Sequence, residues 1–115
     1  MRARDAAKKI HHEFRHMKDL PEGVTFQVST EANKRVIVTL GGVSPSWLWE
    51  FVRHGRHGIP TWEISGEAKV LHQTVTEIAE KYRMVVAELE GITMHSYILS
   101  VLWDHRITAP KEITI

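Results

Sequence analysis

The sequence predicts an α+β fold in which one long helix covers a small antiparallel sheet. Apolar side chains recur at alternating steps of three and four along residues 67–91, which is typical of one face of an α-helix. Apolar and polar side chains alternate along residues 24–30, which is typical of a half-buried strand. We expect an N-terminal helix, a β-hairpin with a third strand, the long helix, and a C-terminal helix or strand.

The composition is that of an ordinary globular protein and excludes several kinds of site. Hydrophobic residues make up 43% of the chain and charged residues 25%, both close to average. For 115 residues we expect a single domain over residues 1–115, with no membrane span and a cytoplasmic location. The absence of cysteine excludes disulfides, thiolate metal sites and cysteine nucleophiles.

Residues 2–20 are predicted to form the N-terminal helix. Its apolar side chains fall on one stripe at helical spacing, formed by Ala3, Ala6, Ala7, Ile10, Phe14 and Met17. Arginine, lysine and histidine occupy the remaining faces. Pro21 and Gly23 end the helix, because proline cannot continue it and glycine permits a reversal.

Residues 24–30 and 35–40 are predicted to pair as a β-hairpin across a short connection at residues 31–34. The second strand is denser in β-branched side chains, so we expect it to be the more central of the two. Residues 59–65 are the expected third strand, and Pro60 favours an edge position for it.

A short helix is predicted between the hairpin and the third strand. Ser44 is a good N-cap residue, and Pro45 suits the first helical position. The helix is expected to stop near Gly55, with one face that closes the core, formed by Trp47, Leu48, Phe51 and Val52.

The long helix is expected to run from residue 67 to Gly91, a residue type that favours the left-handed conformation at a helix end. Val70, Ala79 and Val86 widen its apolar stripe, which favours packing within the chain over a coiled coil. Beyond Gly91 the pattern suits either a helix or a strand, and we favour a helix for residues 92–105. Residues 113–115 are compatible with a terminal strand.

A basic loop is the first candidate site. Residues 1–58 carry ten Lys/Arg against six Asp/Glu, whereas residues 59–115 carry five against eight. The basic half contains a tandem repeat, Arg53, His54, Gly55, Arg56, His57 and Gly58. Guanidinium groups and exposed backbone N–H groups bind phosphate or carboxylate. Tryptophans near the loop suit base stacking. A solvated loop without a ligand is the alternative interpretation.

A second candidate lies on the N-terminal helix. His12, Glu13 and His16 have the H-E-x-x-H spacing, which places both imidazoles on one face of a helix. This five-residue segment resembles the motif of zinc metallopeptidases, which implies a zinc ion on His12 and His16 and a general base at Glu13. The alternative is an exposed basic helix face.

The third candidate is residues 86–97, which are similar to a helix-turn-helix segment. Ala87, Gly91 and Ile92 match the order of small, turn and apolar residues, so a recognition helix would begin near Thr93. Residues 84–105 contain no lysine or arginine to contact phosphates. The alternative is a simple turn at Gly91 between two packed helices.

The first functional hypothesis is a non-enzymatic binding or assembly module without a cofactor, whose basic half contacts nucleic acid or an acidic protein surface. Its contacts would come from the basic loop together with Arg4, Lys8, Lys9 and Arg15. A second hypothesis is a homo-oligomeric structural subunit of a phage or other assembly. A third is a zinc-dependent hydrolase that uses the H-E-x-x-H segment, although enzyme activity is the less favoured class.

Overall fold

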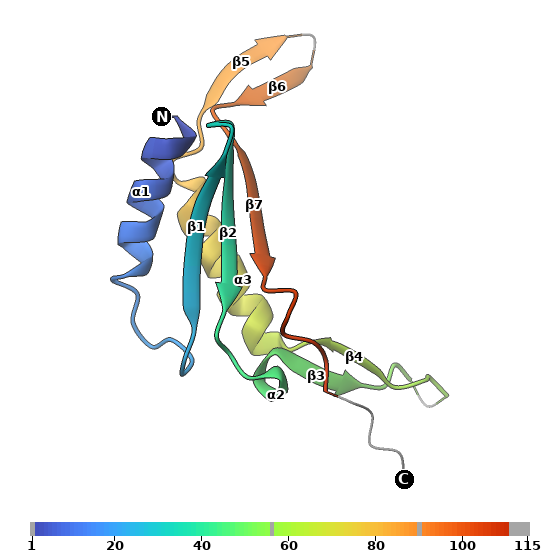
Figure 1. Cartoon of the computed structure of the whole chain (residues 1–115). Helices are drawn as coiled ribbons and strands as arrows, with labels where there is room; N and C mark the ends of the chain where they lie inside the picture. The colour runs from blue at the N-terminus through green and yellow to red at the C-terminus, as the bar shows by residue number, and fades with distance from the viewer. Residues whose placement is uncertain (1, 56, 90, 111–115) are drawn as a thin grey trace.

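The structure, a computed structural model, describes residues 2–55, 57–89 and 91–110. It combines helices with a three-stranded mixed sheet in the order β1-β2-β7 and two separate two-stranded hairpins. The predicted α+β class is therefore confirmed. Figure 1 shows the sheet beside helices α1 and α3, with the hairpins β3–β4 and β5–β6 extending beyond opposite ends of it.

Helix α1 (Ala3–Phe14) is shorter than the predicted N-terminal helix but has the predicted apolar face. The buried side chains of that face are Ala3, Ala6, Ile10 and Phe14. The chain leaves the helix after Arg15, and Asp19 has a left-handed φ of 59°.

Strands β1 (Thr25–Glu31) and β2 (Arg35–Gly41) form the predicted antiparallel hairpin. Its turn places Ala32 and Asn33 in the left-handed region and is closed by the Lys34 N–H, which donates to the Glu31 carbonyl at 3.0 Å. The Asn33 Oδ1 also accepts from the Arg4 backbone N–H at 3.0 Å. The hairpin turn thus holds the first turn of α1, where backbone donors have no partner within the helix.

Strand β7 (Ile98–Trp103) completes the sheet and runs parallel to β2, with Val38 opposite Val101. This corrects three expectations. The sheet is mixed, whereas the sequence predicted an antiparallel one. Residues 92–105 contain strands rather than a helix, and the third strand of the sheet comes from the C-terminal region rather than from residues 59–65. The predicted central position of the 35–40 strand is confirmed, because β2 lies between β1 and β7.

The main core lies between the sheet and the two helices. Val36, Val38 and Leu40 alternate along β2 and are fully buried, in one cluster with Ile10 of α1 and Val75 of α3. Side chains at alternate positions of a strand share one face. Both helices therefore pack against the same face of the sheet.

Helix α2 (Pro45–Leu48) is a single turn, and the Ser44 hydroxyl caps it by accepting from the Trp47 N–H, as predicted. The helix does not continue to residue 52. Residues 49–52 instead form β3 (Trp49–Val52), which pairs with β4 (Thr61–Ile64). Aromatic and β-branched side chains favour a strand when a partner strand is present. The segment predicted as the third strand thus pairs within a separate hairpin.

Helix α3 (Gly66–Glu80) ends eleven positions before the predicted end at residue 91. The chain then forms a second hairpin from β5 (Val85–Leu89) and β6 (Ile92–His95). Gly91 is left-handed as predicted, with φ of 80°, but it serves this hairpin turn instead of a helix end. The Tyr97 hydroxyl donates to the Ala79 carbonyl at 2.7 Å and satisfies the last turn of α3.

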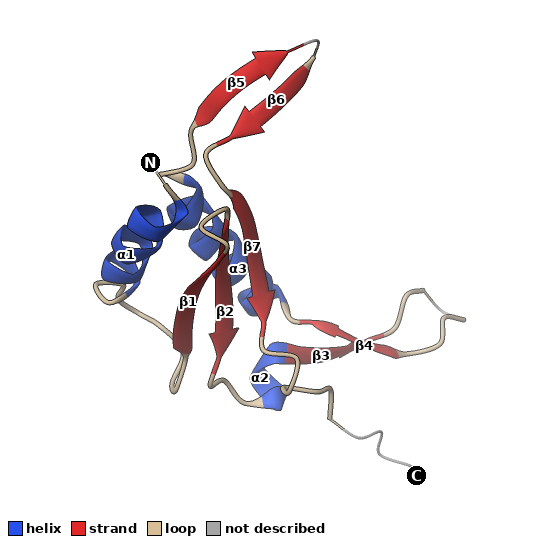
Figure 2. Cartoon of the chain, turned by 45° about the horizontal axis from the view of Figure 1, so that its top comes forward, coloured by secondary structure: helices blue, strands red, loops and turns tan. Residues whose placement is uncertain are grey.

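The molecule is elongated. Its radius of gyration is 17.3 Å and its extents are 55 × 36 × 24 Å, whereas a compact chain of this length has a radius of roughly 13 Å. Figure 2 shows from a second direction that both hairpins lead away from the helices and the sheet. No helix in the described part of the chain is long and apolar enough to cross a membrane. The possible strand at residues 113–115 lies outside the described residues.

Candidate functional site

The basic loop, residues 53–58, lies at the far end of the β3–β4 hairpin. Arg53, His54 and His57 are exposed, whereas Arg56 lies outside the described residues. The basic helix α1 lies on the other side of the sheet in both views (Figures 1 and 2). The fold therefore separates the loop from Arg4, Lys8, Lys9 and Arg15 and does not form one continuous basic surface.

Contacts inside the hairpin involve two residues of the basic loop. The His54 Nε2 lies 2.7 Å from Glu63 Oε1 on β4, so a carboxylate faces this imidazole. A Cβ on Gly58 would lie 1.9 Å from the His54 carbonyl oxygen. Gly58 is thus required by the close approach of the loop backbone to itself, which leaves no room for a Cβ.

The β3–β4 hairpin has one apolar face, although the sequence predicted a helix for the residues of β3 and a strand only for those of β4. Its register places Trp49 opposite Ile64 and Phe51 opposite Trp62. The near end is fixed in the body, where the Trp49 Nε1 donates to the Ile107 carbonyl at 3.0 Å. At the far end the Phe51 and Trp62 rings lie 4.9 Å apart, yet Phe51 remains 54% exposed.

Two further groups of this hairpin are notable in the described part of the chain. The Trp62 indole N–H is buried and has no hydrogen-bond acceptor there. Ile59, beside the basic loop, is 84% exposed. Phe51 and Ile59 are thus two large apolar side chains exposed on the element that projects from the body.

The cationic side chains of α1 divide between two sides of the helix. Arg4, Lys8 and His11 line a groove of about 330 Å³ between α1 and β1, here called the α1 groove. Its opposite wall carries the hydroxyl groups of Ser29 and Thr30. Ammonium, guanidinium and hydroxyl groups donate hydrogen bonds to phosphate oxygens. The α1 groove therefore has the chemistry of an anion-binding surface.

Lys9 and Arg15 lie outside this groove. The Lys9 Nζ lies 5.8 Å from the centre of the Tyr82 ring, which is within the range of a cation–π contact. Arg15 is the exposed C-cap residue of α1. Of the four predicted basic residues of α1, Arg4 and Lys8 share the α1 groove, whereas Lys8 and Lys9 line a second hollow beside Glu13 and Tyr82.

The H-E-x-x-H residues make contacts that differ from those of a zinc site. The Glu13 carboxylate accepts hydrogen bonds from Lys81 Nζ and from the Tyr82 hydroxyl, the latter at 2.6 Å. These two donors lower the pKa of Glu13, whereas a general base works best with a pKa near the working pH. The His16 Nδ1 lies 2.8 Å from the His12 carbonyl.

Within the part of the chain that the structure describes, no third metal ligand accompanies the two imidazoles. The His12 and His16 rings are neighbours, 4.5 Å apart. No group of three or more potential ligands occurs among residues 2–55, 57–89 and 91–110, whereas catalytic zinc takes three protein ligands. The arrangement ties α1 to the end of α3 through Glu13.

The helix-turn-helix prediction for residues 86–97 is wrong. These residues form the β5–β6 hairpin, in which Leu89 pairs with Ile92 across the turn. The predicted recognition helix from Thr93 is absent, because residues 92–95 belong to strand β6. Alternating and β-branched residues can satisfy strand pairing as well as helical spacing.

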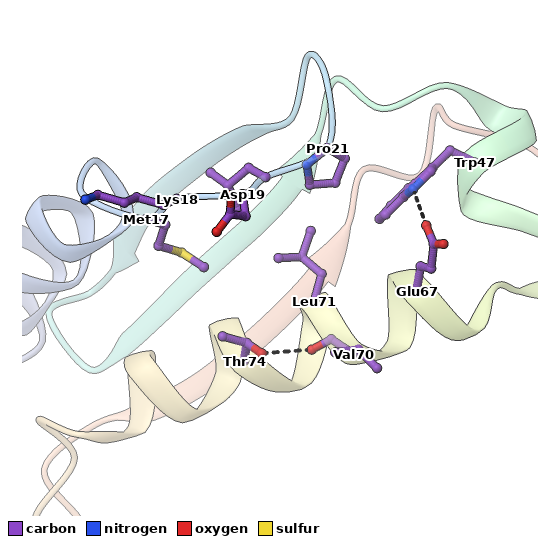
Figure 3. Close-up of a pocket in the computed structure, with 10 residues that line it drawn as sticks. Met17, Lys18, Asp19, Pro21, Trp47, Glu67, Val70, Leu71 and Thr74 are labelled. Atoms are coloured by element: carbon purple, nitrogen blue, oxygen red, sulfur yellow. Dashed lines mark hydrogen bonds between the residues drawn. The ribbon is translucent and has the colours of Figure 1, made fainter.

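A groove of about 410 Å³, here called the α3 groove, was not predicted from the sequence (Figure 3). Apolar side chains that line it come from three segments far apart in sequence: Met17, Leu20, Pro21, Trp47, Val70 and Leu71. The Trp47 Nε1 donates to Glu67 Oε2 at 2.9 Å across one end. Val70, predicted to widen the core stripe, is 65% exposed. Val70, an apolar residue beside the predicted apolar stripe, is the one feature of the sequence that could have indicated this groove.

A second hollow continues the α3 groove and shares Pro21 and Trp47 with it. Its lining includes Glu22, and the rim of the α3 groove includes Asp19 and Glu67. Lys18 is the single lysine or arginine among the lining residues of these two hollows. The combined groove is apolar with a mainly acidic rim.

The chain was also compared with known proteins. It matches no known protein family, no curated protein and no solved structure. The functional argument therefore rests on the geometry described above.

Proposed function

We propose that this chain is a structural subunit that assembles with copies of itself. The observation that carries the proposal is the β3–β4 hairpin, which extends from the body with Phe51 54% and Ile59 84% exposed. A two-stranded hairpin is at best marginally stable alone in water. Covering its apolar face with a second molecule would remove that surface from water and stabilise the hairpin.

The test is the solution mass of the purified chain over a range of concentrations, by light scattering or sedimentation. We expect a mass above that of one chain that rises with concentration. Phe51→Ala should shift the protein towards the single chain, because it removes an apolar contact. Glu50→Ala is the matched control, since Glu50 is exposed on the opposite face of the same strand. A single-chain mass at the highest concentration would overturn the proposal.

Nucleic-acid binding is the second candidate function, and the α1 groove is the observation that favours it. Arg4 and Lys8 face the hydroxyl groups of Ser29 and Thr30 there, and no acidic side chain lines this groove among the described residues. Such a surface suits the phosphate backbone rather than base edges. An acidic protein surface is the alternative partner for the same cations.

Binding of a labelled double-stranded DNA at several salt concentrations tests this function. Arg4→Ala and Lys8→Ala should each weaken binding and reduce the salt dependence by about one phosphate contact. Lys69→Ala on α3 is the control, and Arg53→Ala tests the basic loop in the same assay. Absence of binding by the unmodified chain at low salt would exclude the nucleic-acid function.

A further inference from the structure

Three of the exposed large apolar side chains, Phe51, Ile59 and Val70, lie on a projection and on a hollow of the molecule, whereas Ile98 and Leu102 are exposed on β7. The β3–β4 hairpin is a projection that carries Phe51 and Ile59. The α3 groove is a hollow with apolar walls, and Val70 on it is 65% exposed. A projection and a hollow that both expose apolar surface can bury it together.

The charges on the two surfaces are also complementary. The described part of the basic loop presents Arg53 and His57 to solvent. The rim of the α3 groove and of the hollow beside it presents Asp19, Glu22 and Glu67. Opposite charges around an apolar contact favour encounter and select one orientation over others.

The two surfaces of one molecule do not meet. The hairpin leads away from α3 in both overall views (Figures 1 and 2), whereas the groove lies along α3 and is bordered by Trp47, close to the base of the hairpin. The basic loop at the hairpin tip is therefore free to reach a second molecule. This geometry favours contact between copies over contact within one chain.

We propose that the β3–β4 hairpin of one copy binds in the α3 groove of the next copy, head to tail. The inference rests on the proposed self-assembly and specifies its interface and partner. Phe51 and Ile59 enter the groove beside Val70 and Leu71, and Arg53 lies against the acidic rim. Because each copy has one hairpin and one groove, the contact repeats and produces a closed ring or an open filament.

Disulfide cross-linking is a direct test, because the native chain contains no cysteine. Ile59→Cys places a thiol on the hairpin, and Val70→Cys places one on the groove. Both sites are exposed, at 84% and 65%, so neither change should impair folding. Under mild oxidation, a mixture of the two variants should give a covalent dimer that neither variant gives alone. Ile59→Cys mixed with Glu77→Cys, on an exposed part of α3 outside the groove, is the matched control.

Charge variants test the same contact without oxidation. Phe51→Glu and Val70→Glu should each reduce self-association at least about tenfold, as expected for loss of a central apolar contact. Mixing the two should restore a dimer and nothing larger, because one intact hairpin and one intact groove remain.

The outcomes separate this inference from the proposed function. An oligomer that forms without cross-linking of the mixture would overturn the hairpin–groove contact while leaving self-assembly in place. Cross-linking of Ile59→Cys with itself would overturn it in favour of a symmetric contact between hairpins. A single-chain mass under all conditions would overturn both proposals.

Discussion

At the scale of single residues, one carboxylate connects the two helices of the body. The Glu13 carboxylate of α1 accepts hydrogen bonds from Lys81 and Tyr82 at the end of α3, and each of the three groups shifts the pKa of the others. The hydrogen bonds lower the pKa of Glu13 and raise the pKa of Lys81 and of Tyr82. The same residue that suggested a catalytic base in the sequence therefore has a structural role in the fold.

This tie predicts a loss of stability in acid. A carboxyl whose pKa is lowered on folding stabilises the protein above its ordinary value of 4.5, and the contribution is lost as the pH falls through the folded-state pKa. Glu13→Gln should lower the free energy of unfolding at neutral pH by about 1 kcal/mol and flatten its dependence on pH below that value. Urea unfolding at several pH values measures both effects. Glu50→Gln should leave the pH profile as it is in the native chain; an unchanged profile for Glu13→Gln would contradict the prediction.

The backbone at Gly42 is a second residue-scale feature. A Cβ there would lie 2.0 Å from the Gly23 carbonyl oxygen, and Gly42 has φ of 76°. Gly42→Ala should therefore destabilise the fold by more than about 1 kcal/mol. Gly66→Ala is the control, because a Cβ at Gly66 meets nothing within 4 Å. Thermal unfolding of the two variants measures the difference. Equal melting temperatures would show that the backbone at Gly42 does not approach Gly23 as described.

At the scale of elements, α1 combines a buried face with a cationic face. Ala3, Ala6, Ile10 and Phe14 are buried against the sheet, whereas Arg4, Lys8 and Lys9 face solvent. The buried face fixes the direction in which the cations point, because neighbouring helix positions are about 100° apart. The α1 groove thus depends on the docking of the helix.

Paired substitutions on α1 test this arrangement. Ile10 is fully buried, so Ile10→Ala should cost about 2–5 kcal/mol. Lys9→Ala at the adjacent exposed position should cost at most about 1 kcal/mol, since Lys9 loses only an exposed cation–π contact with Tyr82. Chemical denaturation of the two variants measures the difference. If Ile10→Ala proved as mild as Lys9→Ala, the helix would not be docked on the sheet.

At the scale of the whole molecule, charge is distributed unevenly. Residues 1–58 are basic and residues 59–115 are acidic in balance, and the fold places the basic loop and the acidic rim of the α3 groove on separate surfaces. Exposed opposite charges attract across an interface at low salt and are screened at high salt. The proposed interface should therefore be sensitive to ionic strength.

Self-association should weaken when the salt concentration is raised from about 0.05 M to about 0.5 M, a range over which the screening length falls well below the size of an interface. The apolar contact should persist at high salt. The dissociation constant should therefore rise, but self-association should not be abolished. Sedimentation of the native chain at both salt concentrations measures the shift. Stronger association at high salt would indicate an interface made by apolar contacts alone.

Local patterns in the sequence determined the elements whose partners lie close by in the chain. The stripe of α1, the β1–β2 hairpin and the Ser44 cap follow from spacing and residue type, and all are confirmed. The exposure of the cationic residues on α1 was predictable for the same reason, because a helix with one apolar stripe leaves its other faces in water.

Tertiary structure alone decided the features that depend on distant partners. Strand β7 takes its place in the sheet only by pairing with β2, which lies far away in the sequence. Residues 82–92 are a local exception: their spacing fits a helix, but β5 pairs with the neighbouring strand β6 instead. The exposure of the basic residues was predictable from the sequence, but the distance between the basic loop and α1 was not, because it depends on how the elements pack. The fold also assembled the α3 groove from segments that share no local pattern, because contacts between distant residues depend on how the elements pack together.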